Sequence, residues 1–214
     1  MKHVLCLAIL LIPGCLTIAD ELEWEPVETV VAVVDRTPLL ASDIDLAQRL
    51  RLAQRPIDAD DDAFRSLLLD ARIRLEVQFR DLEASGVLYR LDLDVPAAKR
   101  DLLESVGGME TVGPVLAESG LDETDVDELA LRICAVNAYA DQRLRPRISV
   151  SLAEIETAYR ELAATIESAG EEAPALTAVH EQIHQLVAER KLNDEIERWV
   201  ERAFAEREVT RFIG

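Results

Sequence analysis

The chain has 214 residues and a formal net charge of −19 at pH 7, because 42 acidic residues outnumber 23 lysines and arginines. Such an acidic surface repels phosphate backbones and anionic lipids, which argues against binding to nucleic acid or to an anionic membrane surface. The length is sufficient for one large domain or for two small lobes with buried cores.

The N-terminal segment Met1–Ala19 has the pattern of an export signal. Lys2 opens a short polar region, the apolar run Val4–Ile12 follows, and small residues lead to an expected cleavage site between Ala19 and Asp20. The apolar run is too short to span a membrane, so we expect no stable membrane insertion. The segment therefore predicts export to the periplasm as a soluble protein.

An alternative for the same segment is a lipoprotein signal, in which Ile12-Pro13-Gly14-Cys15 leaves Cys15 attached to lipid. Proline before the glycine is unusual in such sites and no flexible tether follows, so cleavage at Ala19 is the favoured interpretation. That cleavage removes Cys6 and Cys15 and leaves Cys134, which excludes an intramolecular disulfide in the mature chain. Because Cys134 lies on an apolar helical stripe, we expect a buried and unreactive thiol.

A β-hairpin is predicted directly after the acidic lead-in. The β-branched run Val30–Val34 is interrupted by Asp35–Thr37 and resumed by Pro38–Ala41, with Pro38 at a position that an edge strand tolerates. An isolated hairpin is only marginally stable in water, so it needs a third strand or a helix to cover it.

The far end of the chain offers such a strand in Val209–Ile213. We therefore expect the two ends of the chain to meet in one sheet, with Phe212 and Ile213 beside Val31 or Val33.

Helices are predicted for most of the intervening sequence. Ser42 caps the first, with Asp45 completing a variant of the capping box, and Ser151 with Glu154 forms a complete capping box further on. The longest helix carries apolar residues on two faces, so we expect it to be the central core helix. The predicted helices are about Asp43–Gln54, Asp62–Ser85, Pro96–Val106, Met109–Ser119 with a break at Gly113-Pro114, Glu123–Leu144, Leu152–Ser168 and a closing helix after Leu176.

These elements predict a mainly α-helical fold with a small antiparallel sheet, made by the N-terminal hairpin and the C-terminal strand. Characteristic segments follow one another in the order Thr29–Gln54, Gly107-Gly108-Met109, Glu118–Val126, Ile148–Tyr159 and Leu176–Ile213 with Trp199. This series resembles the chaperone domain of the SurA-type periplasmic chaperones, a family linked to peptidyl-prolyl isomerases. The chain therefore divides into a signal peptide over 1–19, an acidic lead-in over 20–28 and, as the resemblance implies, a multi-helix chaperone domain over 29–214. That domain divides into an N-terminal part, 29–169, and a closing helix and strand, 175–214.

The resemblance implies an ATP-independent chaperone that binds unfolded or newly exported polypeptides and serves outer-membrane protein biogenesis. In that family, parvulin-type isomerase modules usually sit between the helix that ends near Tyr159 and the closing helix. Here the interval holds only Arg160–Ala175, and the parvulin signatures are absent. We therefore expect no prolyl isomerase activity and no other enzymatic activity. An envelope assembly or scaffold subunit that binds one folded partner is the alternative on the same fold.

The sharpest chemical motif is the pentapeptide from His180 to His184, which has the HExxH pattern of zinc peptidases. On a helix it places His180 and His184 one turn apart to bind zinc, with Glu181 as general base. The alternative is a packing helix whose apolar stripe includes Ile183 and whose polar edge carries both histidines. No multi-stranded sheet is predicted upstream to support a zinc helix, so we expect no metal and no peptidase activity.

Other cofactor motifs are absent from the sequence. No Gly-rich loop ends in Gly-Lys-Ser/Thr, so ATP binding is not predicted. The acidic clusters Asp58–Asp62 and Asp122–Asp127 lack the spacing of an EF-hand loop and are better explained as helix starts. We therefore expect no cofactor.

An apolar patch that contacts client polypeptides is one interpretation of the predicted helix after Gly108. Its candidate residues are Met109, Val112, Val115 and Leu116. Ordinary core packing explains each of the four residues equally well.

Overall fold

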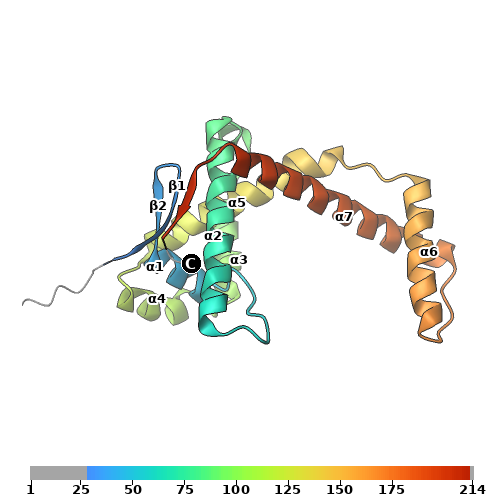
Figure 1. Cartoon of the computed structure of the whole chain (residues 1–214), viewed down its shortest axis with the longest axis horizontal. Coiled ribbons are helices and arrows are strands. Elements are labelled where there is room, and N and C mark those ends of the chain that lie inside the picture. The colour runs from blue at the N-terminus through green and yellow to red at the C-terminus, as the bar shows by residue number, and fades with distance from the viewer. Residues whose placement is uncertain (1–27, 213–214) are drawn as a thin grey trace, which may run out of the picture.

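A computed structural model describes residues 28–212 of the chain (Figure 1). The expected cleavage site at Ala19 and Asp20, the candidate lipoprotein residue Cys15, most of the acidic lead-in, and Ile213 lie outside the described residues. Between residues 28 and 212, no helix has both the length and the apolar composition needed to cross a membrane.

The structure is mainly helical, with one small antiparallel sheet in the strand order β2-β1-β3. β1 (Val30–Val34) pairs with β2 (Thr37–Leu40) as a hairpin and with β3 (Val209–Arg211) from the other end of the chain. The backbone N–H of Phe212 donates to the carbonyl of Val31 at 3.0 Å. The predicted fold class is confirmed, and so is the meeting of the two chain ends at Phe212.

The hairpin turn also holds the C-terminal segment in place. Asp35 adopts a left-handed backbone with a φ of 54°, and its N–H donates to the carbonyl of Glu208 at 2.7 Å. Its carboxylate accepts from the backbone N–H of Glu208 at 3.0 Å and pairs with Arg207 at 3.3 Å. The turn therefore connects residues that lie far apart in the sequence.

The first helix differs from its prediction at both ends. α1 (Ala41–Arg49) begins after Leu40, whose N–H donates to the carboxylate of Asp43 at 2.8 Å. Asp43 thus takes the role predicted for Asp45, and Ser42 lies within the first turn. The helix ends at Arg49 and not at Gln54.

A backbone turn explains this early end. Arg51 has a φ of 53°, and the N–H of Leu52 reaches the carbonyl of Ala47 at 2.9 Å. This is the hydrogen-bond pattern of a helix that stops at a left-handed residue. Glycine usually fills that position, so the arginine gave no stop signal in the sequence.

α2 (Asp61–Ala84) is the central helix, as predicted. Asp60 caps it by accepting from the N–H of Ala63 at 2.8 Å, and Gly86 follows its end with a φ of 66°. Its buried apolar residues serve three clusters: Phe64, Leu68, Leu69, Ile73 and Val77 pack with the sheet and α1, Leu75 packs with α4 and α5, and Phe79 and Leu82 pack with α5 and α7.

α3 (Val95–Glu104), α4 (Met109–Glu118) and α5 (Glu123–Tyr139) complete the helical body. The predicted break at Gly113-Pro114 is wrong, because α4 continues through Pro114. Pro114 removes one helical N–H donor and crowds the carbonyl of the preceding turn, and burial of Val112 and Leu116 on either side offsets this cost. α5 ends at Tyr139 and not at Leu144, and a wider π turn (Ala140–Leu144) and a 3₁₀ turn (Arg145–Arg147) follow it. Another 3₁₀ turn, Leu88–Arg90, links α2 to α3.

α6 (Leu152–Ser168) and α7 (Leu176–Ala205) form the last part of the fold. The capping box predicted for Ser151 and Glu154 is confirmed. α7 reaches from the body to α6, which stands apart from the other helices (Figure 1). We define the arm as α6 together with the first half of α7, residues 176–191.

The two halves of α7 pack against different partners. Its second half joins the body, where the indole N–H of Trp199 donates to Asp81 at 2.8 Å. Its first half packs with α6 in a small separate core of Ile155, Ala158, Ile183 and Val187. The arm therefore depends on a much smaller apolar core than the body does.

Candidate functional site

The HExxH residues lie on the first half of α7. His180 and Glu181 are exposed and His184 is partly buried, whereas Ile183 between them is part of the arm core. Glu181 accepts a hydrogen bond from Gln185 at 3.4 Å. Within residues 28–212, no three His, Cys, Asp or Glu side chains gather in a way that could hold a metal ion. The described structure therefore brings no third ligand to the two histidines.

The four candidate client-binding residues of α4 are divided between the core and the surface. Val112 and Leu116 are 6% and 1% exposed and pack against α1, α2 and α5. Met109 and Val115 are partly buried, and Met109 lines an open groove between α3 and α4 with Pro96 and Leu103. Val112 and Leu116 are thus core residues that an incoming polypeptide does not reach in this conformation.

The expectation of a buried Cys134 is confirmed. Burial raises the pKa of its thiol, which lowers the fraction of reactive thiolate. A nucleophilic role for Cys134 is not supported.

A buried ionic cluster joins α2 to α5. The side chain of Glu76 is fully buried and accepts hydrogen bonds from Arg80 and from Arg132, both at 2.8 Å. Burial raises the pKa of Glu76, but the charges and hydrogen bonds of Arg132 and Arg80 outweigh this and leave it below its ordinary value. Because both carboxylate oxygens are occupied, Glu76 connects helices and is not placed to accept a proton from a substrate.

Sequence reasoning missed this cluster. Glu76 lies on α2 within the apolar pattern from Ile73 to Phe79, and an acid on a buried helix face is the signal that could have revealed it. Neighbouring Arg72 is also buried and donates to Asp43 at 3.1 Å, which connects α2 to α1.

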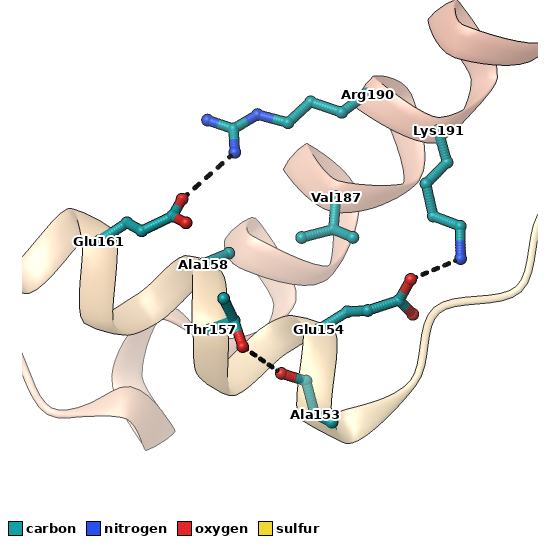
Figure 2. A pocket seen from close by; sticks show the side chains of 8 residues that line it. All are labelled: Ala153, Glu154, Thr157, Ala158, Glu161, Val187, Arg190 and Lys191. Atoms are coloured by element: carbon teal, nitrogen blue, oxygen red, sulfur yellow. Dashed lines mark hydrogen bonds and ion pairs between the residues drawn. The ribbon is translucent and has the colours of Figure 1, made fainter.

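The surface that stands out on the arm is a groove between α6 and α7, with an open volume of about 410 Å³. Figure 2 shows small side chains of α6 on one side and Val187 of α7 on the other, with charged side chains around them. Its lining residues are Ala153, Glu154, Thr157, Ala158, Glu161, Val187, Arg190 and Lys191.

The charges around this groove are divided by helix. Glu154 and Glu161 come from α6, whereas Arg190 and Lys191 come from α7 (Figure 2). Lys191 lies 2.7 Å from Glu154 and also donates to the carbonyl of Ser149 at 2.6 Å. Glu161 and Arg190 are 3.9 Å apart, with side chains 67% and 60% exposed. One pair is therefore tightly held and the other is loose.

Glu154 is held by more than Lys191. Its carboxylate also accepts the backbone N–H of Ser151 at 2.7 Å and the hydroxyl of Ser151 at 2.8 Å. The hydrogen bond from Lys191, followed by those from Ser151, lowers the pKa of Glu154 to about 2. The start of α6 is thereby fixed to α7.

The arm also carries exposed apolar side chains. Leu152, Leu162 and Leu186 are 61%, 36% and 43% exposed. Unlike the lone exposed residues of the body, such as Ile57 and Tyr89, they belong to one small two-helix unit. The arm combines apolar contact area with paired charges, an arrangement that suits binding.

Comparison with known proteins does not assign the chain: no protein-family model matches it, and no curated protein shows significant similarity to it.

Proposed function

We propose that this protein is a passive, ATP-independent chaperone of the SurA type that binds unfolded or newly exported polypeptides in the periplasm. It lacks prolyl isomerase activity and acts by reversible capture of apolar segments. The periplasmic location rests on the export pattern of Met1–Ala19.

The observation that carries this proposal is the arm. It stands apart from the body, it leaves Leu152, Leu162 and Leu186 exposed, and it presents the groove beside Val187. Burying apolar surface stabilises a complex by about 25 cal/mol per Å² without any catalytic group. The acidic surface supports the proposal as well, since a high net charge keeps a protein and its complexes soluble.

The absence of isomerase activity is supported by the connection between α6 and α7. In the described structure this connection is residues 169–175, and the preceding Arg160 lies within α6. Isomerisation of a proline peptide bond has an uncatalysed barrier of about 20 kcal/mol. A short connection between two helices has no room for an enclosing pocket of the parvulin kind.

The test is suppression of aggregation of a chemically unfolded model client, followed by light scattering without nucleotide. We expect the native chain to suppress scattering at near-stoichiometric ratios. A variant with Leu152→Ser, Leu162→Ser and Leu186→Ser should lose most of this effect. A control variant with Ile57→Ser, Leu67→Ser and Tyr89→Ser, which changes exposed apolar residues of the body, should retain it.

Two outcomes would contradict the proposal. If the protein accelerated the isomerisation of a proline test peptide, it would be a prolyl isomerase. Failure to hold any unfolded client, together with tight binding to one folded partner, would favour the scaffold alternative.

Zinc content is the separate test for the HExxH motif. We expect no stoichiometric zinc in the purified protein, and we expect His180→Ala to retain full suppression of aggregation, because His180 is exposed outside the arm core. One tightly bound zinc per chain, together with peptidase activity that His180→Ala abolishes, would establish the peptidase instead.

A further inference from the structure

The groove between α6 and α7 has the form of a site for a third helix. Two helices that pack against each other leave a furrow along their contact, and a third helix fills it in a bundle. Ala153, Thr157 and Ala158 are small side chains on α6, so the backbone of another helix can approach closely. Val187 supplies an apolar contact from α7.

The backbone of the arm favours a helical occupant over an extended one. An extended segment needs hydrogen-bond partners for its own N–H and C=O groups. Around the groove, the backbone groups of α6 and α7 are engaged in their own helices. A helix satisfies its backbone internally and needs only side-chain contacts.

The charged residues of the groove indicate which charges the flanks of that helix carry. Glu154 and Glu161 are seven residues apart, which is two helical turns or roughly 10.5 Å along α6. Arg190 and Lys191 face them from α7. The loose contact of 3.9 Å between Glu161 and Arg190 leaves both side chains able to pair with an incoming segment.

We propose that this groove binds amphipathic helical segments of client polypeptides that carry basic residues along one flank and acidic residues along the other. The aliphatic stripe of the segment lies along the exposed side chains of Ala153 and Thr157, beside the nearly buried Ala158 and Val187. Its basic flank lies along α6, and its acidic flank lies along α7. This inference rests on the proposed function and names the class of segment that the arm selects.

The test measures binding of fluorescent peptides to the full chain by anisotropy. The peptides share one leucine stripe and differ in their flanks: one has lysine on one flank and glutamate on the other, one has lysine on both, and one has glutamate on both. We call the peptide with lysine on one flank and glutamate on the other the two-signed peptide. We expect it to bind roughly threefold or more tightly than either of the others. A proline in the middle of that peptide should abolish binding, because it breaks the helix.

Reversing one charge in the groove should change which of the three peptides binds most tightly. Arg190→Glu leaves Lys191 as the one basic side chain that lines the groove and gives the lining a net negative charge, so the tightest binding should move to the lysine peptide. Glu161→Arg leaves Glu154 as the one acidic side chain that lines the groove and gives the lining a net positive charge, so the tightest binding should move to the glutamate peptide. Arg198→Glu, an exposed change on the second half of α7, should leave the order of the three peptides unchanged.

A blocking variant tests the place of binding. Thr157→Trp fills the groove from an exposed position and should weaken the two-signed peptide at least about tenfold. Gln182→Trp on the first half of α7, at an exposed position that does not line the groove, is the matched control and should bind normally. Circular dichroism confirms that each variant is folded.

The outcomes separate the two proposals. Equal binding of the three peptides, or undiminished binding to Thr157→Trp, overturns the inference about the groove while aggregation suppression by the native chain still supports the chaperone. Failure of the native chain to hold any unfolded client would instead overturn the chaperone proposal.

Discussion

At the scale of single residues, Glu76 joins two helices of the body. Its fully buried carboxylate accepts hydrogen bonds from Arg80 of its own helix and from Arg132 of α5. The guanidinium carbon of Arg132 also lies 5.3 Å from the centre of the Phe79 ring. Removing one partner of a buried ion pair leaves the other charges without compensation. The cluster therefore fixes α5 against α2. The second half of α7, from which the arm extends, packs against these two helices.

We predict that Glu76→Gln lowers the free energy of unfolding by about 2–4 kcal/mol, because Arg80 and Arg132 lose the buried carboxylate between them and keep only their more exposed partners, Glu83 and Glu128. Glu83→Gln is the matched control, since Glu83 pairs with the same Arg80 at a more exposed position, and it should cost less than about 1 kcal/mol. Urea denaturation measures both values. Equal effects of the two substitutions would show that burial of Glu76 is unimportant.

Glu154 controls the response of the arm to acid. Its folded pKa of about 2 lies below the ordinary value of 4.5. A carboxyl group with a lowered folded pKa stabilises the fold above its unfolded pKa, and this stabilisation is lost as the pH falls through the folded value. The contribution of Glu154 is thus complete above pH 4.5 and disappears toward pH 2.

We predict that Glu154→Gln destabilises the protein at neutral pH and that its difference from the native chain shrinks between pH 4.5 and about 2. Denaturation curves across this range measure the difference. Glu156→Gln, an exposed change on the same helix, is the control. A difference that stays constant down to pH 2 would contradict the role of Glu154.

At the scale of elements, the arm has a smaller buried core than the central helix α2. Four buried residues form its core, whereas eleven residues of α2 are buried. Segments with few buried contacts open locally at a lower free-energy cost than the global unfolding of the protein. The arm can therefore open locally at a lower free-energy cost than α2, which would help it adjust its shape under the proposed function.

We predict that backbone amides in the middle of α6 exchange with solvent at least about tenfold faster than those in the middle of α2. Hydrogen exchange followed by mass spectrometry measures both helices in one sample. Ile183→Ala should raise the exchange of α6 further without changing α2, since Ile183 belongs to the arm core. Equal protection of the two helices would show that the arm is as rigid as the body.

The elements also show what the sequence could reveal. Several helix ends are predicted correctly from local signals. These signals are the capping box of Ser151 and Glu154, the acids before α2, and Gly86 after α2. The end of α1 was missed because Arg51 occupies a position that usually holds glycine. The continuity of α4 depends on burial of Val112 and Leu116, which is a tertiary effect.

The candidate site was less accessible to sequence reasoning. The groove needs Ala153, Thr157 and Ala158 to lie opposite Val187, and the sequence does not specify how α6 crosses α7. The sequence also does not distinguish an apolar surface patch on α4 from core packing, and the structure places Val112 and Leu116 in the core.

At the level of the whole molecule, the fold is closed by its two ends. β1 lies between β2 and β3, so the C-terminal strand completes the sheet that covers α2. This closure anchors the second half of α7 in the body while its first half extends outward with α6 (Figure 1). The proposed binding of unfolded chains rests on this arrangement of a closed body that carries a separate two-helix arm.

Site-specific photo-crosslinking to a defined, chemically unfolded client tests most directly that this arm holds polypeptides. A photoreactive residue is placed at Leu162 or Leu186 on the arm, and at Ile57 or Tyr89 on the body, all of which are exposed. We predict strong crosslinks from both arm positions, weak ones from both body positions, and none to the same client once it is folded. Crosslinks that arise equally from the arm and the body, or from the body alone, would contradict the account.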